Sequence, residues 1–307
     1  MPINARQDAD VIIVGGGYAG MTAALQLARA RRKVLVVDAA VRRNRFAGAA
    51  HGFLGYDGAA PDQLWATACD QLLAYPAAAY VEGEATQAEQ SAEGIEVALS
   101  SGARLRAKKL IVASGVEDML PDLPGLKERW GKTVLHCPYC HGYETGGGPL
   151  GVLAFAPHAL HQAELIPDWG ATTFFANEKL ALTDEDKARL ARRGVTVVTG
   201  AVAALVGRGD RLDGVRMQDG RLIEVKALFT AAPTRVASPI PEQLGCAMEE
   251  GPLGAYVSVD AMRQTSLAGV FAAGDMTRPA GNIAFAVADG AMAGVAAHRA
   301  LIMDEMK

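Results

Sequence analysis

The sequence has few cysteines, few aromatic residues and no strong excess of charge of either sign. Its 307 residues include four cysteines and 6% aromatic residues, and 34 acidic residues against 30 basic ones give a formal net charge of −4. Four cysteines are too few for a disulfide scaffold in a chain of this length. The near-neutral balance argues against a protein that binds nucleic acid or an acidic membrane surface.

The chain also lacks a long apolar run and a recognisable targeting segment. No uninterrupted hydrophobic stretch approaches the roughly 20 residues that cross a bilayer, and residues 1–8 contain no hydrophobic region of a signal peptide. We therefore expect a cytoplasmic protein without a membrane or nucleic-acid partner. The length suits about two domains at ~150 residues each.

A glycine-rich turn near the start predicts a dinucleotide site. Val11–Val14 is a continuous apolar run, as in a parallel strand buried on both faces. The sequence Gly15-Gly16-Gly17-Tyr18-Ala19-Gly20 follows, then a predicted helix over 21–31 and a strand over 33–37 that ends in Asp38. A bare G-x-G-x-x-G can be a chance glycine turn, but the strand, helix, second strand and acid together favour a nucleotide site.

Each position of this turn has a role in such a site. Gly15 permits the tight turn, Gly17 lets a pyrophosphate approach the backbone, and Gly20 lets the helix lie close to the strand. Tyr18 and Ala19 complete the turn, and Asp38 can bond a ribose hydroxyl.

A segment near the other end of the chain predicts that the dinucleotide is FAD. Residues 265–275 form a predicted strand that ends in Gly274-Asp275, where an Asp can bond the ribityl chain that NAD lacks. A predicted helix over 281–300 follows, and its first residues include Asn282, Ile283 and Ala284. The positive end of this helix would point at the flavin pyrimidine and stabilise reduced flavin.

Two of the four cysteines lie close together in His136-Cys137-Pro138-Tyr139-Cys140-His141. A C-x-x-C pair serves either dithiol redox chemistry or metal binding. Structural zinc sites usually bring a second pair, and only the separate Cys69 and Cys246 remain. We expect no metal, and a redox disulfide that works against the flavin.

Taken together, these motifs resemble the low-molecular-weight thioredoxin reductase family of flavoproteins over nearly the whole chain. They are the glycine-rich start, Ala113-Ser114-Gly115, the cysteine pair, and Gly274-Asp275 with its helix. The resemblance implies an α/β fold of two Rossmann-like, three-layer domains and a homodimer. The FAD-binding domain would be discontinuous, with residues 1–115 and 247–307, and residues 116–246 would form an inserted NAD(P)-type domain that carries the C-x-x-C.

The resemblance also implies roles for single residues. Cys140 would face the flavin, and Cys137 would exchange with the substrate. Arg43, Asn44 and His51 lie in a segment, 43–58, that would face the flavin or merely cover it. Ala85 would pass the adenine through its backbone, and Ala113 and Gly115 would close the first FAD segment.

His141 stands where the family reductases carry an acid. A histidine titrates near neutral pH, so we expect His141 to be the general base. The alternatives are a histidine that only bonds a backbone carbonyl, and His136 as the proton acceptor.

The family's second nucleotide turn is altered. In the segment that begins at Gly151, Ala154 and Ala156 replace the first two fingerprint glycines, and Pro157 removes an N–H near the helix start. The arginines that would hold a 2′-phosphate are missing after the next strand, where Glu178 could suit an NAD ribose. We expect no productive NAD(P)H site, with an unusual one as the alternative.

Residues 137–144 and 43–58 further resemble the flavin-dependent dithiol oxidases of the gliotoxin, holomycin and romidepsin kinds. This resemblance implies that a small-molecule dithiol is oxidised to a disulfide, with electrons passing to FAD and then to O2 with release of H2O2. One alternative is a thioredoxin-disulfide reductase-like enzyme driven by ferredoxin or by an unusual NAD(P)H site. Another is an FAD redox sensor without turnover.

Overall fold

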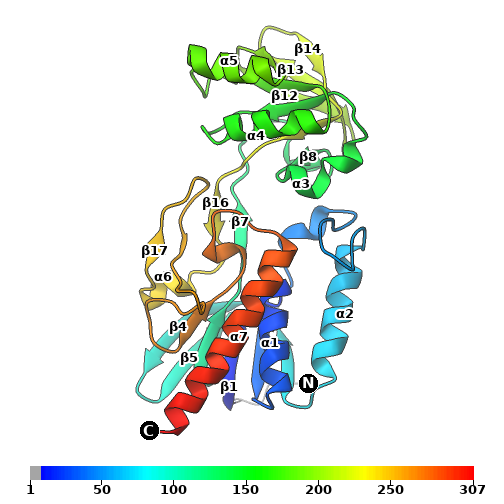
Figure 1. Ribbon diagram of the computed structural model, residues 1–307. Helices are drawn as coiled ribbons and strands as arrows, with labels where there is room; N and C mark the ends of the chain where they lie inside the picture. Colours follow the sequence, from blue (N-terminus) through cyan, green and yellow to red (C-terminus); the bar gives the residue numbers. More distant parts are fainter. Residues whose placement is uncertain (1–7) are drawn as a thin grey trace. The chain divides into compact units, whose positions relative to one another are not determined.

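The structure, a computed structural model, describes residues 8–307 in two compact units (Figure 1). The N-terminal segment whose sequence argued against a signal peptide lies outside the described residues, apart from Asp8. The first unit comprises Met1–Arg45, Pro61–Glu117 and Thr234–Lys307, and the second comprises Phe46–Ala60 and Asp118–Pro233. Each unit is described by itself.

The first unit is built on a seven-stranded sheet. Strands β3, β2, β1 and β6 are parallel neighbours in that order, and β5 and β4 continue the sheet in antiparallel pairing. Strand β19 pairs in parallel with the last residues of β6, so it lies beside the core of the sheet. The bounds are β1 (Asp8–Val14), β2 (Val34–Asp38), β3 (Ala78–Glu82), β4 (Ala85–Ser91), β5 (Gly94–Leu99), β6 (Arg104–Val112) and β19 (Val270–Ala272).

The helices of the first unit pack through small residues. They are α1 (Tyr18–Arg29), α2 (Pro61–Leu73), α6 (Ile240–Leu244) and α7 (Ile283–Glu305). A Cβ added at Gly290 of α7 would lie 2.0 Å from the carbonyl oxygen of Ala19, so only glycine allows α7 to approach α1 this closely. The buried alanines of both helices share one core with β1 and β2.

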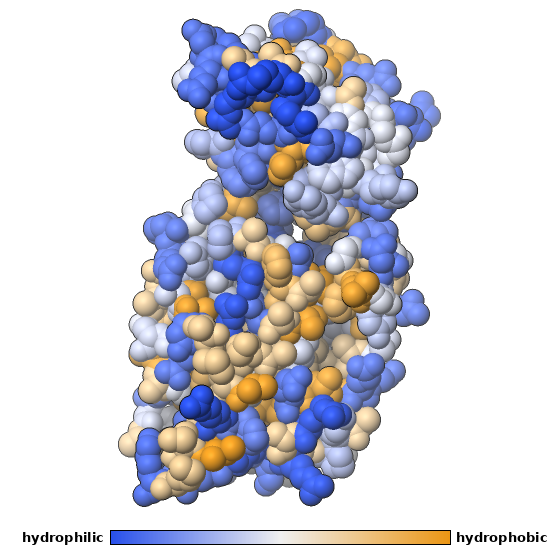
Figure 2. Space-filling model, viewed as in Figure 1, coloured by the Kyte–Doolittle hydropathy of each residue, from blue (hydrophilic) through white to orange (hydrophobic). Residues whose placement is uncertain are grey.

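Helix α7 departs from one expectation. Within residues 8–307 it is the one helix long and apolar enough to cross a membrane, although the sequence led us to expect no such segment. Several of its apolar side chains are exposed, among them Met292, Val295 and Met303, and Figure 2 shows apolar residues along it. Its other face is buried against α1, and a core helix gives the same signal, so this is only a weak indication of a membrane span.

The chain returns to the first unit at Thr234, earlier than the predicted boundary at residue 247. Strand β16 (Thr234–Val236) pairs with β7 (Val116–Asp118). Ile240 and Cys246 lie in the same apolar core as the strands of the first sheet. The short strands β17 (Met248–Glu249) and β18 (Tyr256–Val257) form a further antiparallel pair.

The second unit has its own parallel sheet, in the order β11-β10-β9-β15-β8, with an antiparallel sheet β12-β13-β14 (Figure 1). Its strands are β8 (Val134–Leu135), β9 (Leu150–Leu153), β10 (Thr172–Phe175), β11 (Thr196–Val198), β12 (Val202–Arg208), β13 (Arg211–Met217), β14 (Leu222–Glu224) and β15 (Ala227–Phe229). Its helices are α3 (Pro138–His141), α4 (Ala159–Leu165) and α5 (Asp184–Arg192). Both units thus have the α/β character that the sequence predicted.

Candidate functional site

The turn after β1 requires glycine at two positions and is open at a third. Gly15 has φ +105°, and a Cβ there would lie 2.3 Å from the carbonyl oxygen of Ala113. A Cβ at Gly20 would lie 1.8 Å from the carbonyl oxygen of Gly15. Around Gly17, the N-cap of α1, an added Cβ meets no atom within 4 Å. Free space beside the first N–H groups of a helix suits a pyrophosphate.

Asp38, at the end of β2, lies beside this turn. Its side chain is buried and accepts a hydrogen bond from Tyr80 Oη at 2.8 Å. A Cβ at Gly16 would lie 2.6 Å from Asp38 Oδ2, which shows how close the carboxylate is to the turn. Trp65 Nε1 donates to the carbonyl oxygen of Gly16 at 2.9 Å. No local pattern in the sequence points to the roles of the Tyr80 and Trp65 side chains.

The C-terminal FAD-type segment reaches the same edge of the first sheet. Gly274 has φ +83°, and a Cβ there would lie 3.0 Å from Ala19 Cβ. Asp275 Oδ2 accepts from Arg43 Nη1 at 2.9 Å. Asn282 caps α7 by accepting from the Phe285 N–H at 2.7 Å, so Ile283 and Ala284 open the helix.

The remaining residues that we predicted to contact FAD also belong to the first unit, apart from His51. Asn44 Nδ2 donates to Tyr18 Oη at 3.3 Å. The Ala113 N–H donates to the carbonyl oxygen of Val14 at 2.7 Å, and Gly115 has φ +71°. Ala85 is buried at the start of β4. Because β1, β2, β6 and β19 are parallel, the turns that follow them meet at one edge of the sheet, where such folds bind nucleotides. These residues fit FAD.

In the second unit, Cys137 and Cys140 form a disulfide with their Cα atoms 5.3 Å apart. The Cys140 N–H donates to Cys137 Sγ at 3.2 Å, and an N–H donor of this kind stabilises a thiolate once the bond is reduced. Helix α4 holds the loop, because Gln162 Nε2 donates to the carbonyl oxygen of His136 at 2.8 Å. Tyr139 packs edge-on against Trp169, with ring centroids 5.5 Å apart. The sequence did not point to Gln162 or Trp169.

His141 follows the disulfide and is half-buried. Burial lowers its pKa from the usual value of 6.5, and the charge of His51 acts in the same direction, whereas Glu144 opposes them. The side chain is therefore neutral at pH 7 and able to accept a proton.

His51 belongs to the second unit, in the segment Phe46–Ala60. Its Nε2 lies 3.5 Å from Glu144 Oε1, and its Nδ1 lies 3.5 Å from Asp57 Oδ1. The family resemblance placed His51 in a segment that would face the flavin or merely cover it. The structure groups it with the residues around His141.

The turn between β9 and α4 is hydrogen-bonded within itself and to Asn177. Ala154 is fully buried, and its carbonyl oxygen accepts from Asn177 Nδ2 at 3.3 Å, while Asn177 Oδ1 accepts from the Val202 N–H at 2.8 Å. The N–H groups of Ala159 and Leu160 donate to the carbonyl oxygens of residues 156 and 157, each at 3.1 Å. Two amides that could have held a phosphate are therefore bonded within the loop.

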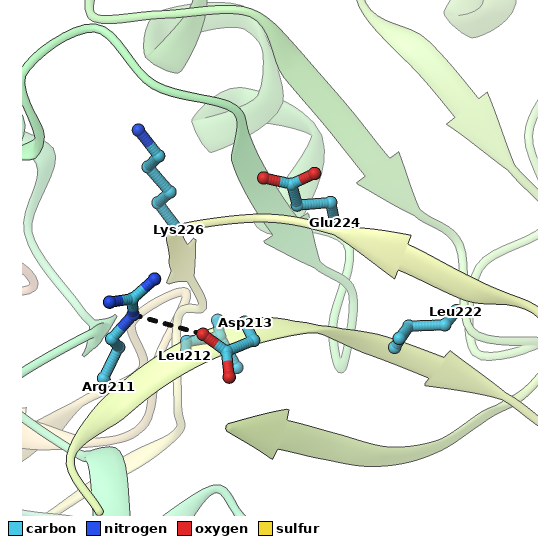
Figure 3. Close-up of a pocket in the computed structure, with 6 residues that line it drawn as sticks. All are labelled: Arg211, Leu212, Asp213, Leu222, Glu224 and Lys226. Carbon is cyan, nitrogen blue, oxygen red and sulfur yellow. Dashed lines mark ion pairs between the residues drawn. The ribbon is translucent and has the colours of Figure 1, made fainter. Parts of the chain in front are cut away.

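A surface hollow of about 390 Å³ lies on the antiparallel sheet of the second unit (Figure 3). Arg211 and Asp213, both of β13 and both lining it, form an ion pair at 3.1 Å. None of the predicted site residues lines it. Within residues 8–307 no three His, Cys, Asp or Glu side chains are grouped so that they could hold a metal ion.

Comparison with known proteins agrees with this arrangement. Residues 9–294 match the family model of the pyridine nucleotide-disulphide oxidoreductases. A protein named thioredoxin reductase tcpT, from Claviceps purpurea, is 34% identical over 309 aligned positions, which cover 96% of this chain and 95% of that protein.

Two solved structures are similar over nearly their whole length. An oxidoreductase from Agrobacterium tumefaciens has a TM-score of 0.93 and 49% identity, covering 97% of this chain and 99% of its own. The structure of HlmI has a TM-score of 0.92 and 36% identity, covering 97% and 94%. The fold and the resemblance predicted from the motifs are confirmed, and FAD is the cofactor. The chain belongs to the pyridine nucleotide-disulphide oxidoreductase family and is a thioredoxin reductase-like flavoprotein.

Proposed function

We propose that the protein is an FAD-dependent dithiol oxidase that forms a disulfide in a small-molecule dithiol and passes the electrons to O2 with release of H2O2. The observation that carries the proposal is the turn between β9 and α4, where alanines stand in place of two fingerprint glycines and the N–H groups of Ala159 and Leu160 are bonded to carbonyl oxygens of the loop. Without that site, electrons enter at the Cys137–Cys140 disulfide.

The cysteine pair carries the first steps. A substrate thiol gives its proton to His141, and the thiolate attacks Cys137 Sγ, so that the Cys137–Cys140 bond breaks and its electron pair moves to Cys140. The second substrate thiolate attacks the substrate sulfur of the mixed disulfide and releases Cys137 as a thiolate. The substrate is thereby oxidised by two electrons and the cysteine pair reduced by two.

The first unit would hold the cofactor. FAD held there would supply a two-electron acceptor for the reduced cysteine pair, with O2 as the final acceptor and H2O2 as the product. The turn at Gly15, Gly17, Tyr18, Ala19 and Gly20 would hold the pyrophosphate, and Asp38 a ribose hydroxyl. Ala85, Ala113 and Gly115 would line the adenosine side, and the flavin side would meet the residues Arg43, Asn44, Gly274, Asp275, Asn282, Ile283 and Ala284. We also infer from the family resemblance a homodimer in the cytoplasm.

The test is oxygen consumption by the purified protein with a dithiol. Cys137→Ser and Cys140→Ser should each lower turnover by at least about 10³-fold, because each removes a sulfur that exchanges electrons, while FAD stays bound. Cys246→Ala is the matched control, because Cys246 is a free buried thiol of the first unit. Turnover close to that of the parent protein in either serine variant would rule out the scheme.

A second candidate is reduction of a thioredoxin-like protein, which uses the same cysteines in the opposite direction. The relative tcpT, which is named a thioredoxin reductase, supports this candidate function. The donor would then be ferredoxin or a nicotinamide cofactor bound in an unusual way. Faster electron transfer from such a donor to thioredoxin than from a dithiol to oxygen would favour this candidate.

A further inference from the structure

Helix α7 carries a buried carboxylate two turns from its start. Asp289 is 1% exposed and follows Ile283, the first residue of the helix, by about 9 Å along the helix axis. A carboxylate that is removed from water in this way is tolerated only where opposite charges and hydrogen-bond donors compensate it. Asp289 must therefore have cationic partners.

Two arginines from different loops are those partners. Arg278 donates from Nε to Asp289 Oδ2 at 2.9 Å and from Nη2 to Oδ1 at 2.6 Å. Arg263 Nη2 lies 2.7 Å from the same Oδ1. The two arginine side chains are themselves mostly buried, with 24% of Arg263 and 23% of Arg278 exposed. We call Arg263, Arg278 and Asp289 the Asp289 cluster.

The Asp289 cluster contains one more positive charge than negative charge. Both guanidinium groups stay protonated, and a single carboxylate faces them. Arg263 Nε is buried and has no hydrogen-bond partner within residues 8–307, so this guanidinium is only partly compensated. The carboxylate of Asp260, in the turn that carries Arg263, is exposed and accepts from the backbone N–H groups of Met262 and Gln264. A positive charge therefore remains in a mostly buried setting.

The backbone around the cluster holds both arginines in place. Arg263 has φ +63°, a left-handed conformation that is unfavourable for a side chain of this kind. Its carbonyl oxygen accepts from the Ala272 N–H, at the end of β19, at 3.0 Å. The guanidinium of Arg278 lies over the ring of Phe285, 4.9 Å from its centroid, in the first turn of α7. The cluster thus joins the two loops that flank β19 to the first two turns of α7.

This position is next to the residues that we assign to the flavin. Arg278 lies between Asp275 and Asn282 in the loop that leads into α7. Asp275 is itself paired with Arg43 at 2.9 Å, so that pair adds no net charge. Reduction of a flavin by two electrons and one proton leaves a negative charge on its ring, and a positive charge nearby stabilises that form.

We propose that the Asp289 cluster is an electrostatic site that stabilises the reduced form of the bound flavin and so raises its reduction potential. Its charge has the same sign as the partial charge at the N-terminus of α7, and the two effects add. The three side chains act through their charge and are not catalytic residues. The inference goes beyond the proposed function, because it holds whichever way electrons pass between the flavin and the cysteine pair.

The test is the reduction potential of the flavin at pH 7, measured anaerobically against a reference dye. The full chain with Cys137→Ser and Cys140→Ser is the parent, so that the cysteine pair takes up no electrons. Arg263→Gln removes a positive charge and should lower the ratio of reduced to oxidised flavin at a fixed potential by about fivefold, equivalent to about 20 mV. Asp289→Asn removes the negative charge and should raise the ratio by about fivefold. Arg263→Lys keeps the charge and should match the parent.

The matched control is Arg32→Gln at the opposite end of α7. It breaks another arginine–carboxylate pair, in which Arg32 Nη2 donates to Glu305 Oε2 at 3.0 Å, and it should leave the potential unchanged. Flavin content and thermal melting show whether each variant is folded. If Asp289→Asn does not fold, the comparison of Arg263→Gln with Arg263→Lys decides the question.

Opposite shifts in Arg263→Gln and Asp289→Asn support the proposal, because a purely structural role would not reverse the sign with the charge removed. Shifts in the same direction, or a potential equal to that of the parent in Arg263→Gln, would overturn it. No dithiol takes part in the measurement. Its failure would leave the oxidase proposal standing, and a failure of dithiol oxidation would leave the role of the Asp289 cluster standing.

Discussion

The two strand–turn–helix units of this protein share a plan and differ in what fills the turn. After β1, glycines at positions 15 and 20 remove side chains that would strike the backbone, and space remains around Gly17. After β9, Ala154 and Ala159 are buried in the core, and Asn177 is bonded to the turn itself. Helix α1 begins one residue after Gly17, whereas α4 begins three residues after Ala156. The first turn leaves space beside the N-terminus of its helix, whereas in the second turn two amides are hydrogen-bonded within the loop.

The largest effect should come from closing the open turn. Gly15→Ala would strain a φ of +105° and drive its methyl against the Ala113 carbonyl. A left-handed conformation alone costs an alanine about 1–2 kcal/mol, and the contact adds to this. We expect at least a hundredfold weaker FAD binding, measured by flavin retained on purification. Ala154→Gly, the matched change in the second turn, should keep its FAD. Full flavin occupancy in Gly15→Ala would contradict the claim that the turn after β1 needs a glycine at this position to bind FAD.

A second prediction concerns where the electrons enter. If they enter at the cysteine pair, His141→Gln should slow flavin bleaching by a dithiol by about 10²-fold, because the thiol loses its base. Burial lowers the pKa of His141 below 6.5, so the parent protein should keep its rate from pH 7 down to about 6.5 and lose it only below, where the imidazole is protonated. Activity that already falls between pH 8 and 7 would indicate another base, with His136→Gln as the next variant to measure.

Asn177, which bonds the turn after β9, should contribute to the stability of the fold and not to cofactor binding. Asn177→Ala leaves the Val202 N–H and the Ala154 carbonyl without their partner, which costs about 1–3 kcal/mol in the free energy of unfolding. Denaturant melts followed by circular dichroism measure this loss, while flavin content should stay constant. A stable variant that has gained tight NADPH binding would show that Asn177 alone closed the turn.

The smallest effect is expected from restoring two glycines. Ala154→Gly with Ala156→Gly should raise the rate of flavin bleaching by NADPH less than about twofold, because Pro157 still lacks an N–H and Asn177 still occupies the turn. A tenfold gain, equivalent to about 1.4 kcal/mol, would mean that the missing glycines were the main barrier.

Local patterns in the sequence predicted the elements and the motifs that lie within a few residues of each other. Nearby residues were enough to predict three features: the apolar run of β1, the turn at Gly15–Gly20, and the disulfide spacing of Cys137 and Cys140. The late start of α4 could be foreseen from Pro157. The roles of Cys137, Cys140 and the FAD contacts stay predictions that the variants above address.

Contacts between distant residues could not be read in this way. Nothing near Asp38 signals the hydroxyl of Tyr80, and nothing near His136 signals Gln162, because each pair meets only when separate elements pack together. The pairing of β16 with β7 moves the return to the first unit to Thr234. Both carboxylates near His51 follow it in the sequence, and one of them, Glu144, lies 93 positions away.

The most direct measurement of the central claim is anaerobic flavin absorbance with three donors added separately: NADPH, NADH and dithiothreitol. If the second turn is closed and electrons enter at Cys137, only the dithiol bleaches the flavin, and admitting air restores the absorbance with one H2O2 per flavin. Fast bleaching by either nicotinamide cofactor would contradict the account.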